Sequence, residues 1–210
     1  MPDVRSTALT VIALAALTAC GGGAGADGPA ATDRSLAAVT IDEIGLPVEY
    51  ATHAYLTNDE ADAGGEVRFA AADGVDPSLA PDLSTLVLPA SAGYADRWCQ
   101  DGNADGCVTD MLGDGRVSLV KWQLEEPEED PGIIEVAVAG DDGIVKLNYH
   151  GDSITKDPRE PGVMPDGVGV DELLALAASD RLGAHVTQAD HDAGQDLSTW
   201  VEEEPDTSGF

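Results

Sequence analysis

Two short segments in the second half of the chain alternate apolar and polar residues on either side of a turn sequence. The first covers residues 133–139 and the second residues 144–150, and residues 140–143 between them read Gly-Asp-Asp-Gly. A period of two residues is typical of a strand with one buried face, and Gly and Asp are favoured in tight turns. The pattern predicts an antiparallel hairpin over about residues 133–150.

Two registers are compatible with this hairpin. A two-residue Asp142-Gly143 turn would pair Val138 with Leu147, whereas a four-residue loop shifts the partners by two positions. A shift of two keeps every side chain on the same face. Both registers therefore gather one apolar set on the inward face: Ile134, Val136, Val138, Val145, Leu147 and Tyr149.

A third strand is predicted over residues 116–124, where β-branched and aromatic residues are frequent. Val120, Trp122 and Leu124 share one face of this strand. The next residues, 125–131, hold five acids and two prolines, which is typical of a solvated loop that ends a strand. Together with the hairpin, the strand predicts an antiparallel sheet.

Two short helices are predicted after the hairpin. Residues 170–178 begin with acids in the first turn and repeat apolar residues along one helical face: Val170, Leu173, Leu174 and Ala177. Residues 188–193 suit a second helix, capped by Thr187 and stopped by Gly194. The predicted fold class is α+β: a small antiparallel sheet, including the hairpin at about 133–150, packed by one or two short C-terminal helices.

The first half of the domain, residues 35–95, is harder to assign. Its apolar residues stand between Gly, Asp and Pro clusters and predict short strands: Leu36, Val39, Ile41, Ile44, Leu46, Tyr50, Tyr55, Val67, Phe69 and the run 83–88. We expect these strands to complete the same core, because dividing about 170 residues would leave each half marginal. Residues 35–204 are thus predicted to be one globular α+β domain, with a frayed acidic tail at 205–210.

The charge of the chain excludes two classes of protein. Forty Asp and Glu residues against ten Lys and Arg give a formal net charge of -30. Such an imbalance excludes a nucleic-acid binder and a polybasic module that lies on an anionic membrane.

The N-terminus has the organisation of an export signal. Arg5 precedes an uncharged, mostly apolar run over residues 8–19, which is too short to span a bilayer as a permanent helix. The run ends in the tetrad Leu-Thr-Ala-Cys at residues 17–20, which resembles the lipobox of bacterial lipoproteins. The resemblance implies that residues 1–19 are a signal peptide, that Cys20 is diacylated on sulfur and that the mature chain starts there. An ordinary secretory leader with an incidental cysteine is the alternative.

Residues 20–34 hold this cysteine and a Gly/Ala-rich segment with almost nothing to bury, so a flexible linker is predicted. A Gly-rich chain of this length spans on the order of 20 Å. Cleavage removes one acid and one base, Asp3 and Arg5, so the mature chain keeps a net charge of -30 and anionic headgroups repel it. Two acyl chains suffice for anchoring without basic residues. The predicted location is the cell membrane, through a lipid anchor, on the extracytoplasmic face.

Two further cysteines, Cys99 and Cys107, are separated by seven residues that include Gly and Asn. Exported proteins keep disulfides, and the intervening residues can turn the chain back. A Cys99–Cys107 disulfide is therefore predicted. The alternative, a metal site with two thiolates, lacks the spacing of two residues between cysteines and any histidine close in sequence.

The same loop resembles the start of a calcium-binding loop. Asp101, Asn103 and Asp105 place oxygens at positions 1, 3 and 5, with Gly106 at position 6. Position 12, which brings a bidentate Glu in such loops, is Leu112. Two interpretations stay open: a calcium site at these three residues, or a polar turn closed by the disulfide.

Motifs that would assign an enzyme class are missing from the sequence. It contains no GxSxG, no HExxH, no P-loop and no GxGxxG after a strand, so no catalytic residue and no cofactor is assigned. The predicted function is a non-enzymatic module of the cell envelope that binds a protein or a ligand. The alternatives are an extracytoplasmic hydrolase using carboxylates and a calcium-modulated binding module. A cleft holding carboxylates about 5 to 10 Å apart would favour glycoside hydrolysis, whereas a shallow apolar face would favour binding.

Overall fold

The computed structural model describes residues 28–54, 61–71, 80–91, 94–100, 104–126, 132–150, 154–160 and 168–203. Its elements are, in chain order, helix α1 (Asp33–Ile44), strands β1 (Val48–His53), β2 (Ala63–Phe69) and β3 (Asp82–Leu88), helix α2 (Tyr94–Trp98), strands β4 (Gly106–Met111), β5 (Val117–Gln123), β6 (Ile133–Gly140) and β7 (Gly143–His150), and helices α3 (Val170–Ala177) and α4 (Gln188–Gln195). Among these helices, none combines the length and the hydropathy needed to cross a membrane.

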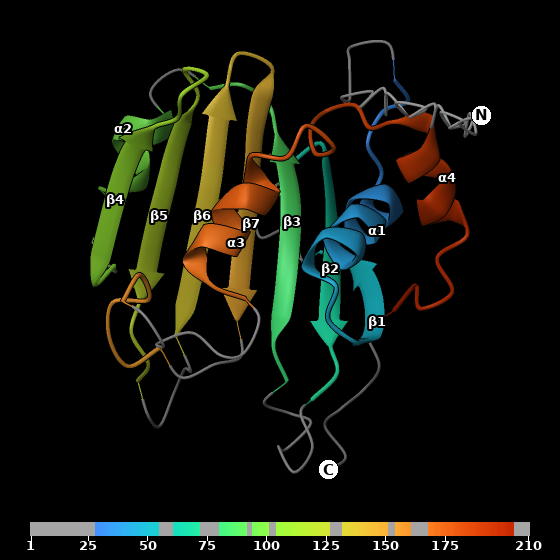
Figure 1. Cartoon of the computed structure of the whole chain (residues 1–210), viewed down its shortest axis with the longest axis horizontal. Helices are drawn as coiled ribbons and strands as arrows, with labels where there is room; N and C mark the ends of the chain where they lie inside the picture. The colour runs from blue at the N-terminus through green and yellow to red at the C-terminus, as the bar shows by residue number, and fades with distance from the viewer. Residues whose placement is uncertain are drawn as a thin grey trace, which may run out of the picture.

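The strands form one antiparallel sheet in the order β1-β2-β3-β7-β6-β5-β4. Helices α1 and α3 lie across one face of the sheet, and α4 packs on α1 (Figure 1). The predicted α+β class is confirmed, including the packing of the sheet by C-terminal helices. The sheet is larger than the sequence indicates, because the strands of the first half of the chain join it through β3 and β7.

The hairpin of β6 and β7 adopts the second of the two predicted registers. Val138 pairs with Val145 and Val136 with Leu147, so the partners are shifted by two from those of an Asp142-Gly143 turn. The predicted inward set lies in the main core, between the sheet and the helices. The predicted third strand, β5, pairs with β6 and adds Val120 and Trp122 to this core.

The strands predicted over residues 36–44 are wrong, because these residues belong to α1. Val39, Thr40 and Ile41 are β-branched and favour strands. Leu36, Val39 and Thr40 also have the i, i+3, i+4 spacing of a helical face, and all three are fully buried. Burial of this face against the sheet outweighs the local preference. The other expected strands of the first half are β1, β2 and β3.

The folded part of the chain also starts before the predicted boundary at residue 35. Thr32 caps α1 by accepting a hydrogen bond from the N–H of Ser35, at 3.2 Å. One residue earlier, the N–H of Ala31 donates to the carbonyl of Ala184, at 2.9 Å. The predicted linker over residues 20–34 is therefore too long at its C-terminal end. Residues 20–27 and the predicted tail at 205–210 lie outside the described residues.

A second, smaller core lies on the other face of the sheet. It joins Trp98 of α2 to Leu119, Ala137 and Ile144 of the strands. The Nζ of Lys146 lies 4.6 Å from the centroid of the Trp98 ring, which adds a cation–π contact at the border of this core.

Cys99 and Cys107 form the predicted disulfide. Cys99 directly follows α2, and Cys107 is the second residue of β4. The bond therefore ties the end of α2 to the sheet beside the second core.

Removing this disulfide should loosen the second core. For a loop of this length the chain-entropy estimate is a loss of about 2 to 3 kcal/mol of unfolding free energy in the Cys99→Ser/Cys107→Ser variant. Urea unfolding followed by tryptophan fluorescence measures the change, and the emission of Trp98 should shift to the red as α2 detaches. Equal unfolding midpoints for the variant and the oxidised protein would contradict a stabilising role.

Candidate functional site

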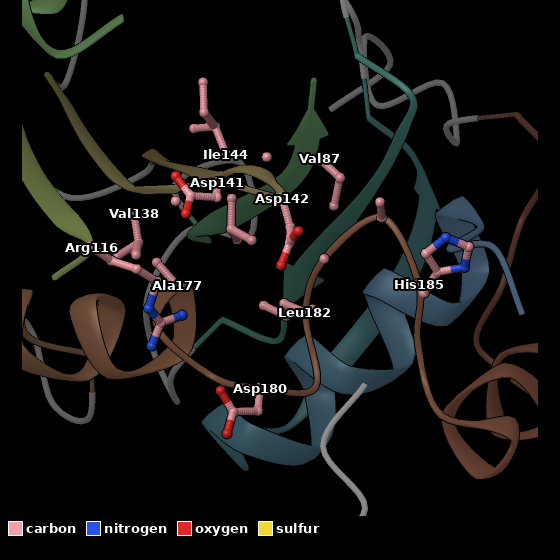
Figure 2. A pocket seen from close by; sticks show the side chains of 15 residues that line it. Val87, Arg116, Val138, Asp141, Asp142, Ile144, Ala177, Asp180, Leu182 and His185 are labelled. Carbon is pink, nitrogen blue, oxygen red and sulfur yellow. The ribbon is translucent and has the colours of Figure 1, made fainter. Parts of the chain in front are cut away.

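A groove lies at one end of the sheet, between the β6–β7 turn and the segment that follows α3 (Figure 2). Its volume is about 540 Å³, within the range of small-molecule sites. It is lined by Val87, Arg116, Val138, Gly140, Asp141, Asp142, Gly143, Ile144, Val145, Ala177, Asp180, Leu182, Gly183, Ala184 and His185.

The floor of the groove is apolar. Val87 comes from β3, Val138 from β6 and Val145 from β7, and all three are buried. Leu182, in the turn after α3, is buried against them. A ligand on this floor would contact aliphatic carbon contributed by several elements of the main core.

The rim of the groove carries three carboxylates. Asp141 and Asp142 form the tip of the β6–β7 hairpin, and Asp180 lies in the turn after α3. Figure 2 shows the carboxylates of Asp141 and Asp142 at the hairpin side of the groove and that of Asp180 across from them. All three residues are exposed to solvent. The rim therefore presents negative charge on both sides of the apolar floor.

Gly143 fixes the position of the hairpin tip. Its φ of +143° lies in the region that favours glycine, and a Cβ there would be 2.9 Å from the carbonyl oxygen of Leu88. The turn is thus pressed against the end of β3, which keeps Asp142 over the groove.

Arg116 is the one arginine among the lining residues, and its guanidinium is already engaged. Its Nε donates to the Oδ2 of Asp114 at 2.8 Å, and its Nη2 donates to the carbonyl of Ala178 at 2.9 Å. The first contact neutralises its charge, and the second holds the C-terminal end of α3 against the start of β5. The charge available to a ligand is therefore that of the rim carboxylates.

The chain enters the domain beside this groove. The Nδ1–H of His185 donates to the carbonyl of Gly28, at 2.9 Å, and the N–H of Val186 donates to the carbonyl of Pro29, at 3.0 Å. His185 also lines the groove. Gly28, the first residue that the structure describes, therefore lies beside the groove.

A second cluster of titratable residues lies at the N-terminus of α1. The Nδ1 of His53 is 2.6 Å from the Oδ2 of Asp33, and its Nε2 is 3.3 Å from the Oε2 of Glu202. The other oxygen of Asp33 accepts the N–H of Gly64 at 2.7 Å, and Trp200 packs edge-on against the His53 ring. The cluster joins α1, β1, β2 and the C-terminal segment, so its geometry is that of a structural connection.

This cluster predicts a pH dependence of stability. The hydrogen bond to Asp33 raises the pKa of His53 above its ordinary value of 6.5. The stabilising contribution is complete below pH 6.5 and is lost as the pH rises through the higher pKa of the folded state. The side chain is half exposed, so solvent limits the effect to less than about 1 kcal/mol. In urea unfolding, the free energy of unfolding should fall less between about pH 6 and 8.5 for His53→Gln than for the wild type. Parallel pH profiles of the two proteins would contradict a stabilising contribution from protonated His53.

The structure places the residues predicted from the sequence only in part. Cys20, Asp101 and Asn103 lie outside the described residues. Asp105 precedes β4, where its Oδ2 accepts the N–H of Leu124 at 2.7 Å. One oxygen of the third predicted calcium ligand is thus committed to a backbone contact. Within the described ranges, no group of three or more His, Cys, Asp or Glu side chains is arranged to hold a metal ion. Calcium binding at the three residues stays a prediction.

Sequence reasoning missed the groove. From the sequence, Asp141 and Asp142 are recognisable only as turn residues, and Asp180 and Leu182 only as residues that follow the helix predicted over 170–178. The Gly-Asp-Asp-Gly sequence indicates a turn but not what lies beneath it. Their juxtaposition depends on how α3 crosses the sheet, which no local pattern encodes.

Comparisons of the chain with protein-family models, with curated proteins and with solved structures found no match. Function is therefore inferred from the groove and from the N-terminal sequence.

Proposed function

We propose that this chain is a lipid-anchored, extracytoplasmic binding protein whose groove takes a small amphipathic cation. The observation that carries the proposal is the combination of an apolar floor with three exposed carboxylates at the rim. An aliphatic group fits the floor, and an ammonium or guanidinium group fits the rim.

The two parts of the groove would contribute differently to affinity. Each CH₂ group buried on the floor is worth about 0.8 kcal/mol, whereas each exposed ion pair at the rim is worth less than about 1 kcal/mol. Because the floor residues are themselves buried, the apolar area that a ligand can cover is limited, and both parts of the groove would contribute to the binding free energy. The carboxylates of Asp141, Asp142 and Asp180 would reject anions, and thereby set the selectivity.

The extracytoplasmic location is supported by two independent features. The sequence at residues 17–20 resembles a lipobox, with Cys20 as the acylated residue. The Cys99–Cys107 disulfide is typical of compartments outside the cytosol. Both features fit a body held at the cell membrane by acyl chains.

Hydrolysis is the second candidate, because three carboxylates line one groove. A glycoside hydrolase needs a carboxyl group that stays protonated near neutral pH, and such a group is usually buried in an apolar enclosure. Asp141, Asp142 and Asp180 are all exposed. The groove therefore supports binding better than catalysis.

Calorimetric titration of the protein, purified in detergent, tests the groove with three probes: hexylammonium, hexanoate and methylammonium. Hexylammonium should bind at least about fivefold more tightly than the other two, because it alone combines the apolar and the cationic group. The Asp141→Asn/Asp142→Asn variant should weaken it by about threefold or more. A matched control, Glu49→Gln/Glu203→Gln, removes the same charge from exposed positions that do not line the groove.

Equal affinity for hexylammonium and hexanoate would refute an acidic binding groove. Equal affinity of the Asp141→Asn/Asp142→Asn variant and of the control for hexylammonium would also refute the acidic groove. The general negative charge of the chain would then explain the preference for a cation.

A further inference from the structure

The two edge strands of the sheet, β1 and β4, differ in whether another segment of the described chain is hydrogen-bonded to them. At the β1 edge, the N–H of Ala51 donates to the carbonyl of Thr199 at 2.9 Å, and the N–H of Val201 donates to the carbonyl of Ala51 at 2.8 Å. The C-terminal segment thus occupies the middle of this edge. The opposite edge is β4, which has only β5 as a neighbour in the described sheet (Figure 1).

Strand β4 carries large apolar side chains at exposed positions. Residues 108–111 are all exposed. Val108 and Met111, with 36% and 70% of their surface accessible, are the large hydrophobic residues that the described part of the chain leaves exposed. Both belong to β4, so exposed apolar surface is concentrated on this edge.

The register shows which backbone groups of β4 point outward. The N–H of Leu112 donates to the carbonyl of Arg116, at 2.8 Å, in line with the β4–β5 register. Hydrogen-bonded pairs alternate along an antiparallel ladder, so the backbone groups of Thr109 and Met111 point away from β5. The N–H of Met111 is bound by the Oδ1 of Asp110, at 2.7 Å. Thr109 therefore offers both a donor and an acceptor to a further strand.

Natural sheets usually protect an open edge with lysine, proline or a bulge in the middle of the strand. Strand β4 contains neither lysine nor proline, and its pairing with β5 is continuous from Gly106 to Met111. The edge is thus able to accept another strand at the backbone of Thr109.

We propose that β4 is a docking edge, at which an extended, basic segment of a partner protein adds to the sheet as a further strand. The backbone of Thr109 would hydrogen-bond to the added strand. On one face of the sheet Met111 would contact its apolar side chains, and on the other face Val108 would contact the aliphatic stems of its basic side chains. Strand addition of this kind obtains its affinity from main-chain hydrogen bonds and its specificity from the side chains.

Charge favours a basic partner over a second copy of this chain. Each copy has a net charge of -30, and two of them joined through β4 would repel each other. Asp110 on the strand and Asp114 in the next turn are exposed. Asp114 is already paired with Arg116, so lysine or arginine in the added segment would face the carboxylate of Asp110.

The probe for this edge is a fluorescein-labelled nine-residue peptide in which Val and Thr alternate with Lys. Fluorescence anisotropy should report binding to the full-length protein in detergent. The Thr109→Pro variant removes the outward N–H without removing a bond to β5, and should weaken binding at least about tenfold. The matched variant Thr109→Val keeps the N–H and should bind as the wild type does. Near-UV circular dichroism confirms that both variants are folded.

Two further peptides complete the test. The same peptide N-methylated at every residue has no N–H to donate to β4 from either edge and should not bind, and a peptide with Glu in place of Lys should bind more weakly. Equal binding by the N-methylated peptide or by Thr109→Pro would overturn the docking edge. A dimer in sedimentation that Thr109→Pro abolishes would overturn the choice of partner and assign the edge to a second copy.

Discussion

Replacing Cys20 by Ala should remove the protein from the membrane. The proposed anchor depends on the thioether at this residue, and two acyl chains hold a protein stably where a single one is marginal. The charge of the chain would not replace the anchor, because a net charge of -30 opposes contact with anionic headgroups. We expect more than about 90% of the protein to leave the membrane fraction, or to persist as a precursor that keeps residues 1–19.

Fractionation combined with mass analysis distinguishes these two results. The wild type should carry a diacylglyceryl group on a chain that begins at Cys20. The control Cys107→Ser keeps the proposed anchor and should stay in the membrane fraction. A Cys20→Ala protein that is cut before residue 20 and still sediments with membranes would refute lipid anchoring.

The second large effect should come from Gly65 in β2. A Cβ at this position would lie 2.2 Å from the carbonyl oxygen of Asp33 and 2.8 Å from the backbone nitrogen of Ala37, both in α1. These are backbone atoms, so no change of rotamer can relieve the clash. Gly65→Ala must therefore push α1 away from the sheet, and should lower the unfolding free energy by about 3 kcal/mol or more.

Urea unfolding compares Gly65→Ala with Gly113→Ala. Gly113 lies in the turn between β4 and β5, and a Cβ there would have no atom within 4 Å. We expect its substitution to change stability by less than about 0.5 kcal/mol. A difference below about 1 kcal/mol between the two variants would show that the contact between α1 and β2 adapts without cost.

The sequence was most informative where one period was uninterrupted. Alternation over the hairpin predicted β6 and β7, and it gave the correct inward face although two registers were open. Capping residues predicted α4, which begins after Thr187. In both cases the local pattern and the packed structure favour the same conformation.

Prediction failed where packing over a long sequence distance decides the conformation. Residues 39–41 are β-branched and suggested a strand, but Gly65, on a strand elsewhere in the sequence, provides the flat surface on which α1 lies. The groove was missed for the same reason. Its rim combines the tip of a hairpin with Asp180, and these meet only after α3 has crossed the sheet.

The C-terminal segment at the β1 edge sets a limit on assembly. A sheet with two free edges can be extended from both ends, and identical copies can then polymerise into a filament. Here the backbones of Thr199 and Val201 are hydrogen-bonded to the β1 edge. Growth through β4 would therefore stop after a single addition, and even copies crowded together on one surface would form finite complexes.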